Sequence, residues 1–229
     1  MIQLALETST RNASVAVLDG AKTLGETTLN RDQPGTSALL PAIATLLTSS
    51  ALNPAEVQQI CVSTGPGSFT GLRMGIAAAK TWAWAKGCRL IGIPTHRVIA
   101  EQMRCEAISP DCHIASVIDA QRGEWFVELF RAGSSGSVES VQPSQVVIPQ
   151  DFLDSLAHPT LMSGPGLLRH HDRIRITRDI RLADQDHWLP RAETVGQLAH
   201  TDQFASLDPF RLRPEYGRKS AAEEKLDSG

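Results

Sequence analysis

The sequence lacks any long hydrophobic run, and it lacks a basic segment in front of one. No stretch reaches the roughly 18 consecutive apolar residues that a membrane-spanning helix needs. Residues 1–7 contain no Lys or Arg, so the start of the chain does not have the pattern of a secretory signal. We therefore expect a cytoplasmic protein that makes no contact with a membrane.

The chain also lacks the spacings that mark common metal and catalytic sites. Its four cysteines include no C-x-x-C pair, and no two of its seven histidines are four residues apart, as H-E-x-x-H requires. There is no G-x-S-x-G nucleophile motif and no G-x-x-x-x-G-K-[ST] phosphate loop. The sequence therefore predicts no metal site and no catalytic residues of these types.

An excess of positive charge is missing as well. The chain has 22 basic and 25 acidic residues, for a net charge of -3. This balance provides no general attraction to nucleic acid. Any RNA is expected to meet a local patch or another subunit.

What is present is an alternation of strands and helices in two α/β halves. The first half opens with a meander of three strands, at residues 2–6, 13–18 and 24–29. Helices at about 36–51, 72–86 and 95–103 then alternate with strands at 58–64 and 90–93. Thr36 or Ser37 is the expected cap of the first helix, and Pro41 predicts a late start or a kink. The second half shows strands at 113–119 and 124–131 and helices at 149–157 and 191–199.

This order predicts two lobes and a tail. We place the first lobe at residues 1–108 and the second at 109–216, and we expect the late helix to be able to pack back on the first lobe. The charged end, residues 217–229, is expected to be disordered. A meander followed by a helix is the opening of lobes of the actin, sugar-kinase and Hsp70 type.

Two helices carry unusually little charge. Residues 33–55 contain no Asp, Glu, Lys or Arg, and the 72–86 helix has apolar or small residues on most sides. A helix that is apolar on most sides is buried on most sides, so the helices form either a protein–protein interface or a compact core. We favour the interface, with partner-binding candidates Leu39, Leu40, Ile43, Leu47, Met74 and Ala78.

A glycine-rich turn, residues 65–71, precedes the second of these helices. Together with the hydroxyl-rich turn after the first strand it could hold phosphate, with candidates Thr8, Ser9, Thr10, Gly65 and Gly67. The alternative is close packing, in which Ser68 caps the helix and Gly71 and Gly75 let it approach a neighbour. The turn contains no lysine, so we favour packing.

Three charged residues follow the strand at 113–119. Asp119, Arg122 and Glu124 could supply a catalytic base, but a turn whose charges pair across a hairpin is the favoured interpretation.

These residues carry a family resemblance. The opening L-A-L-E-T-S-T, the G-P-G-S-F-T-G-L-R-M-G segment at 65–75, the I-D-A-Q-R-G-E-W-F segment at 118–126 and P-F-R-L-R at 209–213 resemble the TsaB (YeaZ) family. The resemblance implies a two-lobed ASKHA fold (actin-like ATPase, ribonuclease H-like). It also implies a role in forming N6-threonylcarbamoyladenosine at position 37 of tRNAs that read ANN codons.

In that family the protein is a non-catalytic subunit. The resemblance implies a heterodimer with the TsaD transferase, docking of the TsaE ATPase, indirect contact with tRNA, and homodimers through the same helices. No cofactor is expected, except ATP or ADP at a junction with partner subunits. Glu7 stands where the family has Asp, Gly164-Pro165-Gly166 stands for G-D-G, and Gln121 replaces Arg; the first two departures weaken the case for independent nucleotide chemistry.

Two other functions remain as alternatives. One is an independent ATP-hydrolysing enzyme of the sugar-kinase type, and the other is a relative of metallopeptidases. The missing histidine pair argues against the second alternative.

Overall fold

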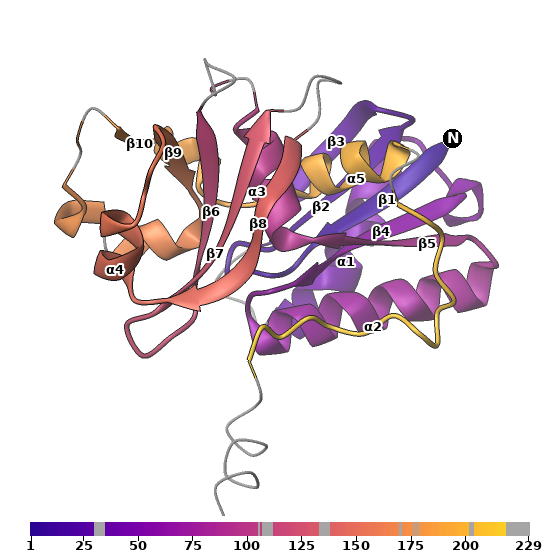
Figure 1. Ribbon diagram of the computed structural model, residues 1–229. Helices are drawn as coiled ribbons and strands as arrows, with labels where there is room; N and C mark the ends of the chain where they lie inside the picture. Colours follow the sequence, from indigo (N-terminus) through magenta and orange to yellow (C-terminus); the bar gives the residue numbers. More distant parts are fainter. Residues whose placement is uncertain are drawn as a thin grey trace, which may run out of the picture.

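The computed structural model describes two five-stranded sheets with helices packed on them (Figure 1). The described residues are 1–29, 35–104, 106, 112–132, 138–169, 171–175, 177, 179–201 and 204–218, without the side chains of 35–37 and 173. The expected caps Thr36 and Ser37 therefore lie outside the described side chains. Among the described helices, none combines the length and the hydropathy that a membrane crossing requires.

The first sheet has the strand order β3-β2-β1-β4-β5. Its strands are β1 (Ile2–Glu7), β2 (Ser14–Asp19), β3 (Lys22–Thr28), β4 (Gln59–Gly65) and β5 (Arg89–Pro94). The first three strands run antiparallel as the predicted meander, and β4 and β5 then continue the sheet in parallel with β1. The strands β1, β2 and β4 are buried on both faces, since helices cover the sheet from both sides.

The second sheet repeats this order as β8-β7-β6-β9-β10. Its strands are β6 (His113–Asp119), β7 (Trp125–Ala132), β8 (Val138–Val147), β9 (Thr160–Ser163) and β10 (Ile180–Leu182). Here too the first three strands form an antiparallel meander, and the last two add in parallel to the first of them. The repeated order is what a two-lobed ASKHA fold requires.

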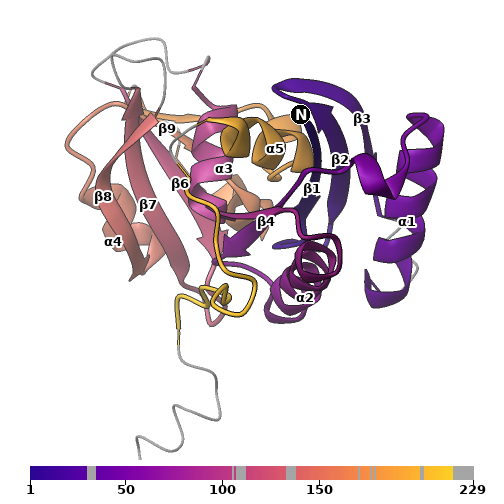
Figure 2. The same ribbon diagram turned by 90° about the vertical axis from the view of Figure 1, so that its right-hand side faces the viewer.

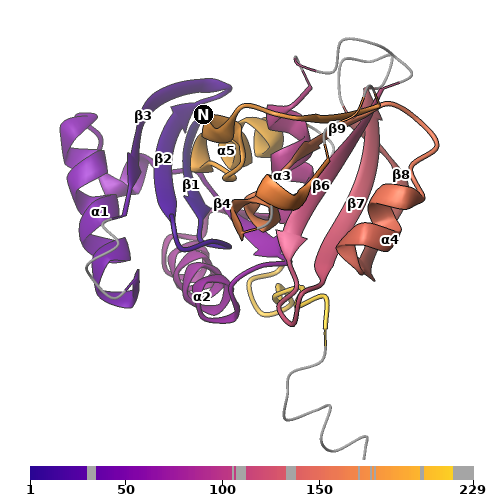
Figure 3. The same cartoon turned by 90° about the vertical axis from the view of Figure 1, so that its left-hand side faces the viewer.

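Helices cover both faces of the first sheet. On one face, α1 (Gly35–Ser49) and α2 (Phe69–Lys86) lie side by side over the larger core cluster (Figure 2). On the other face, α3 (Thr95–Gln102) and α5 (Ala192–His200) pack on the sheet (Figure 3). The remaining helices are α4 (Pro149–Asp154), η1 (Pro54–Glu56), η2 (Pro165–Arg169), η3 (His171–Arg173) and η4 (Gln185–His187).

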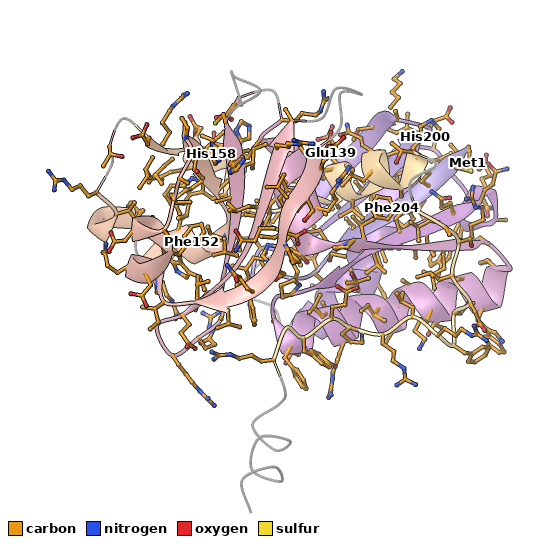
Figure 4. The ribbon with its side chains drawn as sticks, in the orientation of Figure 1. Met1, Glu139, Phe152, His158, His200 and Phe204 are labelled. Atoms are coloured by element: carbon orange, nitrogen blue, oxygen red, sulfur yellow. The ribbon has the colours of Figure 1, made fainter. Side chains whose placement is uncertain are left out.

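The end of the chain returns to the first sheet. Figure 4 shows His200 and Phe204 on the same side of the molecule as Met1, whereas Phe152 and His158 lie over the second sheet. Residues 204–218, here called the C-terminal segment, then run along α2 toward the second sheet. The expected boundary between residues 108 and 109 lies outside the described residues.

Two local features differ from the expectations. Helix α1 runs from Gly35 to Ser49 with Pro41 inside it, so a late start, the first of the two expected effects of Pro41, is not found. The strands β8, β9 and β10 were not predicted. The side chains of β8 are mostly exposed and it contains Pro143, which suits an edge strand but weakens the strand pattern in the sequence. The strands β9 and β10 have only four and three residues, too few to show a pattern.

Helix α3 joins the two lobes through a buried histidine. His96 is 1% exposed, and its Nδ1 and Nε2 lie 2.9 Å from Ser116 Oγ and 3.0 Å from Ser144 Oγ, on β6 and β8. Burial of the ring lowers the pKa of His96 to about 3, because the charged form would lose its hydration. The neutral imidazole thus bridges α3 to the second sheet.

This burial predicts a pH-dependent stability. Below the usual histidine pKa the unfolded chain binds a proton that folded His96 does not, so the free energy of unfolding falls as the pH drops from 6.5 toward 3. From pH 7 to pH 5 we expect a loss of about 2 kcal/mol from this group. Urea unfolding of the wild type and of His96→Gln at both pH values measures it. The variant should lose less stability, and equal losses would contradict the assignment.

Candidate functional site

The turn after β1 is closed on itself. The backbone N–H and the hydroxyl of Ser9 both donate to Glu7 Oε1, at 2.6 Å and 2.5 Å. Glu7 and Thr8 are 0% exposed, and burial raises the pKa of the Glu7 carboxyl despite these hydrogen bonds. Among the described residues, Glu7 Oε2 and Thr8 Oγ1 have no hydrogen-bond partner. The first turn is therefore an internal structure, not an exposed one.

The glycine turn closes over this first turn. The Ser68 N–H donates to the backbone oxygen of Ser9 at 2.7 Å. The Ser68 hydroxyl accepts from the Gly71 N–H at 3.3 Å, which confirms Ser68 as the N-cap of α2. A Cβ added at Gly71 would overlap the Thr8 backbone oxygen, and one added at Gly75 would overlap the Thr8 hydroxyl. The helix can lie this close to β1 only because both positions lack a side chain.

This packing corrects the phosphate-binding hypothesis. Thr8 and Ser9 are buried, and the Ser9 N–H and hydroxyl are occupied by Glu7. A Cβ at Gly67 would overlap the Ser9 backbone oxygen, so that the two turns face each other without a gap for a ligand. Thr10 is partly exposed, and its hydroxyl accepts from the Asn12 N–H at 3.2 Å. The arrangement favours close packing over a phosphate cradle.

The C-terminal segment contacts both lobes, at the glycine turn and at the turn between β6 and β7. The Glu215 N–H donates to the Thr64 backbone oxygen at 2.7 Å, and the Glu215 backbone oxygen lies against Gly65. Three residues on, Arg218 pairs with Glu124 and donates to the Ala120 backbone oxygen at 3.3 Å. Backbone atoms of the C-terminal segment therefore fill the space beside Gly65 of the glycine turn.

Residues 217 and 218, which we assigned to the tail, contact the second lobe. Gly217 lies against the ring of Phe126, and Arg218 makes the contacts just described. Residues 219–229 lie outside the described residues.

The turn between β6 and β7 pairs with distant residues. Asp119 accepts from the Gln121 N–H at 2.8 Å and forms an ion pair with Arg169 at 3.2 Å. Glu124 pairs with Arg218, as noted above. Both acids therefore also bind arginines that come from later parts of the chain, and pairing within the hairpin stays a prediction. Gln121 and Arg122 have φ values of 64° and 56°, so the turn runs through the left-handed region.

The predicted partner surface divides into core and exposed residues. Leu39, Ile43 and Leu47 are each 2% exposed and pack in the core beneath α1, so their assignment to a partner surface is corrected. Leu40, in contrast, is 61% exposed. On α2, Met74 and Ala78 are partly buried at the edge of the same core.

The exposed side of α1 and α2 is nonetheless poor in charge. Besides Leu40, the exposed α1 positions are Pro41, Ala44, Thr45, Thr48 and Ser49. An exposed helix usually carries charged residues on its outer side, and this one has none among its described side chains. The exposed side of α1 with Met74 and Ala78 of α2 is called the helical face below.

Sequence reasoning missed the role of the C-terminal segment and of three large exposed side chains. Phe69 is 42% exposed, Trp84 70% and Phe210 72%. The motif at 209–213 contains Phe210 and drew attention to this part of the sequence, but no local pattern shows that the motif lies beside α2.

Within the described parts of the chain, no three His, Cys, Asp or Glu side chains gather as metal ligands would. His113 and His158 stack with their ring centres 4.6 Å apart, and the other described histidines are dispersed. His170 lies outside the described residues.

Compared with known proteins, the chain matches one family model and several curated relatives. The model, described as "TsaD: tRNA N6-adenosine threonylcarbamoyltransferase", matches residues 33–158. The "tRNA threonylcarbamoyladenosine biosynthesis protein TsaB" of Bacillus subtilis is 27% identical over 230 residues, covering 98% of this chain and 97% of that protein. The protein of the same name from Haemophilus influenzae is 28% identical, and 93% of each chain is covered.

Solved structures agree on the fold. YeaZ from Pseudomonas aeruginosa superposes with a TM-score of 0.76 at 22% identity, covering 94% of this chain and 99% of that one. A second Pseudomonas aeruginosa structure, of a protein with similarity to peptidase YeaZ, gives 0.77 at 22% identity, with 95% and 99% covered. The predicted two-lobed ASKHA fold is thereby confirmed.

Proposed function

The chain belongs to the TsaB (YeaZ) family of tRNA threonylcarbamoyladenosine biosynthesis proteins, and from this premise we propose that it is a non-catalytic scaffold subunit. In this proposal it binds a TsaD-type transferase, which attaches threonylcarbamoyl to N6 of adenosine 37 in tRNAs that read ANN codons. The chain positions and activates the transferase without touching the reacting atoms.

One observation carries the proposal, which is the uncharged helical face. Leu40 of this face is 61% exposed, and the other exposed positions of α1 are a proline, an alanine and hydroxyl-bearing residues. An exposed leucine within an uncharged surface gains free energy when a partner covers it, because apolar area then leaves water. A second helical pair with the same character is the partner that fits this face. A TsaD-type subunit, or a second copy of this chain in a homodimer, is expected to supply it.

The closed first turn supports a non-catalytic role. An ATP-using lobe needs its first turn open to phosphate, whereas Glu7 here is buried and bonded to Ser9. We propose that any ATP or ADP used by the complex lies at a junction with partner subunits. We propose likewise that a TsaE-type ATPase docks on the assembled pair. We propose that the protein works in the cytoplasm and makes no contact with a membrane.

Reconstitution of the modification tests this function. With a TsaD-type transferase, a TsaE-type ATPase, threonylcarbamoyl-AMP and unmodified tRNA, we expect modified tRNA only when this chain is present. The chain alone should release no phosphate from ATP, and Thr8→Ala should not change that result, since the Thr8 hydroxyl is buried. Phosphate release by the chain alone that Thr8→Ala abolishes would support the independent ATPase instead. Modification at full rate without the chain would refute the scaffold role.

A further inference from the structure

A groove separates α2 from the C-terminal segment, on the side of α2 away from α1 (Figure 2). It has a volume of about 500 Å³ and is open to solvent. Its floor includes Ile76 of α2 and Leu212 of the segment, and its sides carry basic and aromatic side chains. We call it the α2 groove, and none of its lining residues belongs to the helical face.

The α2 groove is positively charged in a chain that is negative overall. Arg73, Lys80 and Arg213 line it, and no acidic residue is among its lining residues. The two elements that form it, residues 69–86 and 204–218, contain six basic and two acidic residues, although the whole chain has a net charge of -3. The lining of the groove itself therefore carries three positive charges and no negative charge.

The basic side chains Arg73 and Lys80 of the groove form hydrogen bonds with uncharged partners. Arg73 Nε donates to the Tyr216 hydroxyl at 2.7 Å, and its guanidinium lies 3.8 Å from the centre of the Phe69 ring. Lys80 Nζ donates to the Leu212 backbone oxygen at 3.3 Å. Within the described part of the chain, no ion pair neutralises Arg73, Lys80 or Arg213. Their charge remains available to an anionic ligand.

Aromatic rings alternate with these charges. Phe210 lines the groove and is 72% exposed, and Tyr216 lines it beside Phe69, with ring centres 4.7 Å apart. Trp84, 70% exposed, lies one helical turn beyond Lys80 on the same stripe of α2. An exposed aromatic ring gains free energy when a ligand stacks on it, because apolar area then leaves water.

We propose that the α2 groove binds a single-stranded stretch of RNA. Basic side chains that follow a groove attract phosphates, and exposed aromatic rings stack with unpaired bases. An acidic peptide would use the charges but not the rings, so RNA accounts for more of the surface. The choice of RNA rests on the proposed function in tRNA modification, and the contact makes this subunit a direct tRNA-binding element of the complex.

The chain offers a matched pair of variants to test the groove. Arg213 lines the groove, whereas Arg211, two residues earlier, does not; the Arg211 side chain is 87% exposed and lies 3.9 Å from Asp208. The variants Arg213→Glu and Arg211→Glu change the net charge equally. We would measure binding of the full-length purified chain to an unmodified tRNA transcript and to a short single-stranded RNA oligonucleotide, over a range of salt concentrations.

The expected results separate groove binding from general charge attraction. Arg213→Glu should weaken binding by roughly tenfold or more and reduce the salt dependence by about one phosphate contact, whereas Arg211→Glu should have less than about a threefold effect. Phe210→Ala should weaken binding about 5- to 100-fold with little change in salt dependence, because it removes stacking. Circular dichroism would establish that all three variants remain folded.

Three results would overturn the proposal. One is equal loss for the two arginine variants, which would indicate net charge alone. Another is no measurable RNA binding by the wild type at low salt. The third is loss of the TsaD-type partner in Arg213→Glu with RNA affinity unchanged, which would make the groove a protein contact. We expect Arg213→Glu and Phe210→Ala to copurify with that partner as the wild type does. Copurification therefore tests the scaffold function, and the RNA-binding measurement tests the groove.

Discussion

Replacing Ile43 by Asp is expected to unfold the subunit and not merely to release a partner. Ile43 is 2% exposed in the core under α1, so the change removes buried apolar area and places a carboxylate there. We expect the free energy of unfolding to fall by about 5 kcal/mol or more, which is comparable to the whole stability of many domains. Urea unfolding followed by circular dichroism measures this loss.

Leu40 provides the matched control on the same helix. It lies three residues before Ile43 but is 61% exposed, so Leu40→Asp should change stability by only about 0.5 kcal/mol. The same variant should weaken the complex with a TsaD-type subunit at least about 30-fold, because it places a charge in a desolvated contact. A folded Ile43→Asp variant that only loses its partner would contradict the packing of α1. If Leu40→Asp bound the TsaD-type subunit with full affinity, the assignment of the helical face as the partner-binding surface would be wrong.

The second large effect concerns the contact between α2 and the first turn. A methyl group at Gly71 would overlap the backbone oxygen of Thr8, which cannot rotate away. We expect Gly71→Ala to lower the free energy of unfolding by about 3 kcal/mol, even though alanine favours a helix over glycine by about 1 kcal/mol. The three atoms nearest to a Cβ at Gly75 all belong to the Thr8 side chain, and we expect Gly75→Ala to lower the free energy of unfolding by about 2 kcal/mol.

Thr8→Ala separates these two clashes. It removes the hydroxyl and methyl groups that a Gly75 methyl would meet and leaves the Thr8 Cβ at 3.1 Å. In the Thr8→Ala background, Gly75→Ala should therefore cost about 1–2 kcal/mol less, whereas Gly71→Ala should cost the same as before. Urea unfolding of the three single variants and the two double variants gives these coupling energies. An equal rescue of both glycine variants would show that the turn moves as a unit and that the close approach is not specific.

Much of the fold could be predicted because its signals are local. The meander, the helices and the order of the first lobe follow from hydrophobic periodicity and from turn residues, and Ser68 was identified as a cap by its place before a helix. Strand β8 was missed because it is an exposed edge strand with Pro143, so it lacks the alternation that burial imposes. The motif at 65–75 identified the family because its spacing is unusually specific.

The candidate site was less predictable, because its contacts join distant residues. Periodicity places Leu39, Ile43 and Leu47 on one stripe of α1, but whether a stripe faces the sheet or a partner depends on where the helix packs. The burial of Thr8 and Ser9 was not predictable for a similar reason. The sequence shows only a polar turn after a strand, whereas Thr8 is covered by α2 at Gly75, which is 67 residues further along the chain.

The sequence by itself determined the family, the order of elements and the absence of charge along residues 33–55, since each is written in neighbouring residues. Only the tertiary structure decided which leucine of α1 remains exposed, that the two turns fill each other, and that the C-terminal segment lies beside α2 to form a basic, aromatic groove. The physical reason is that burial and groove shape are properties of pairs of elements. They arise when surfaces far apart in the chain exclude water together, and no single segment encodes that outcome.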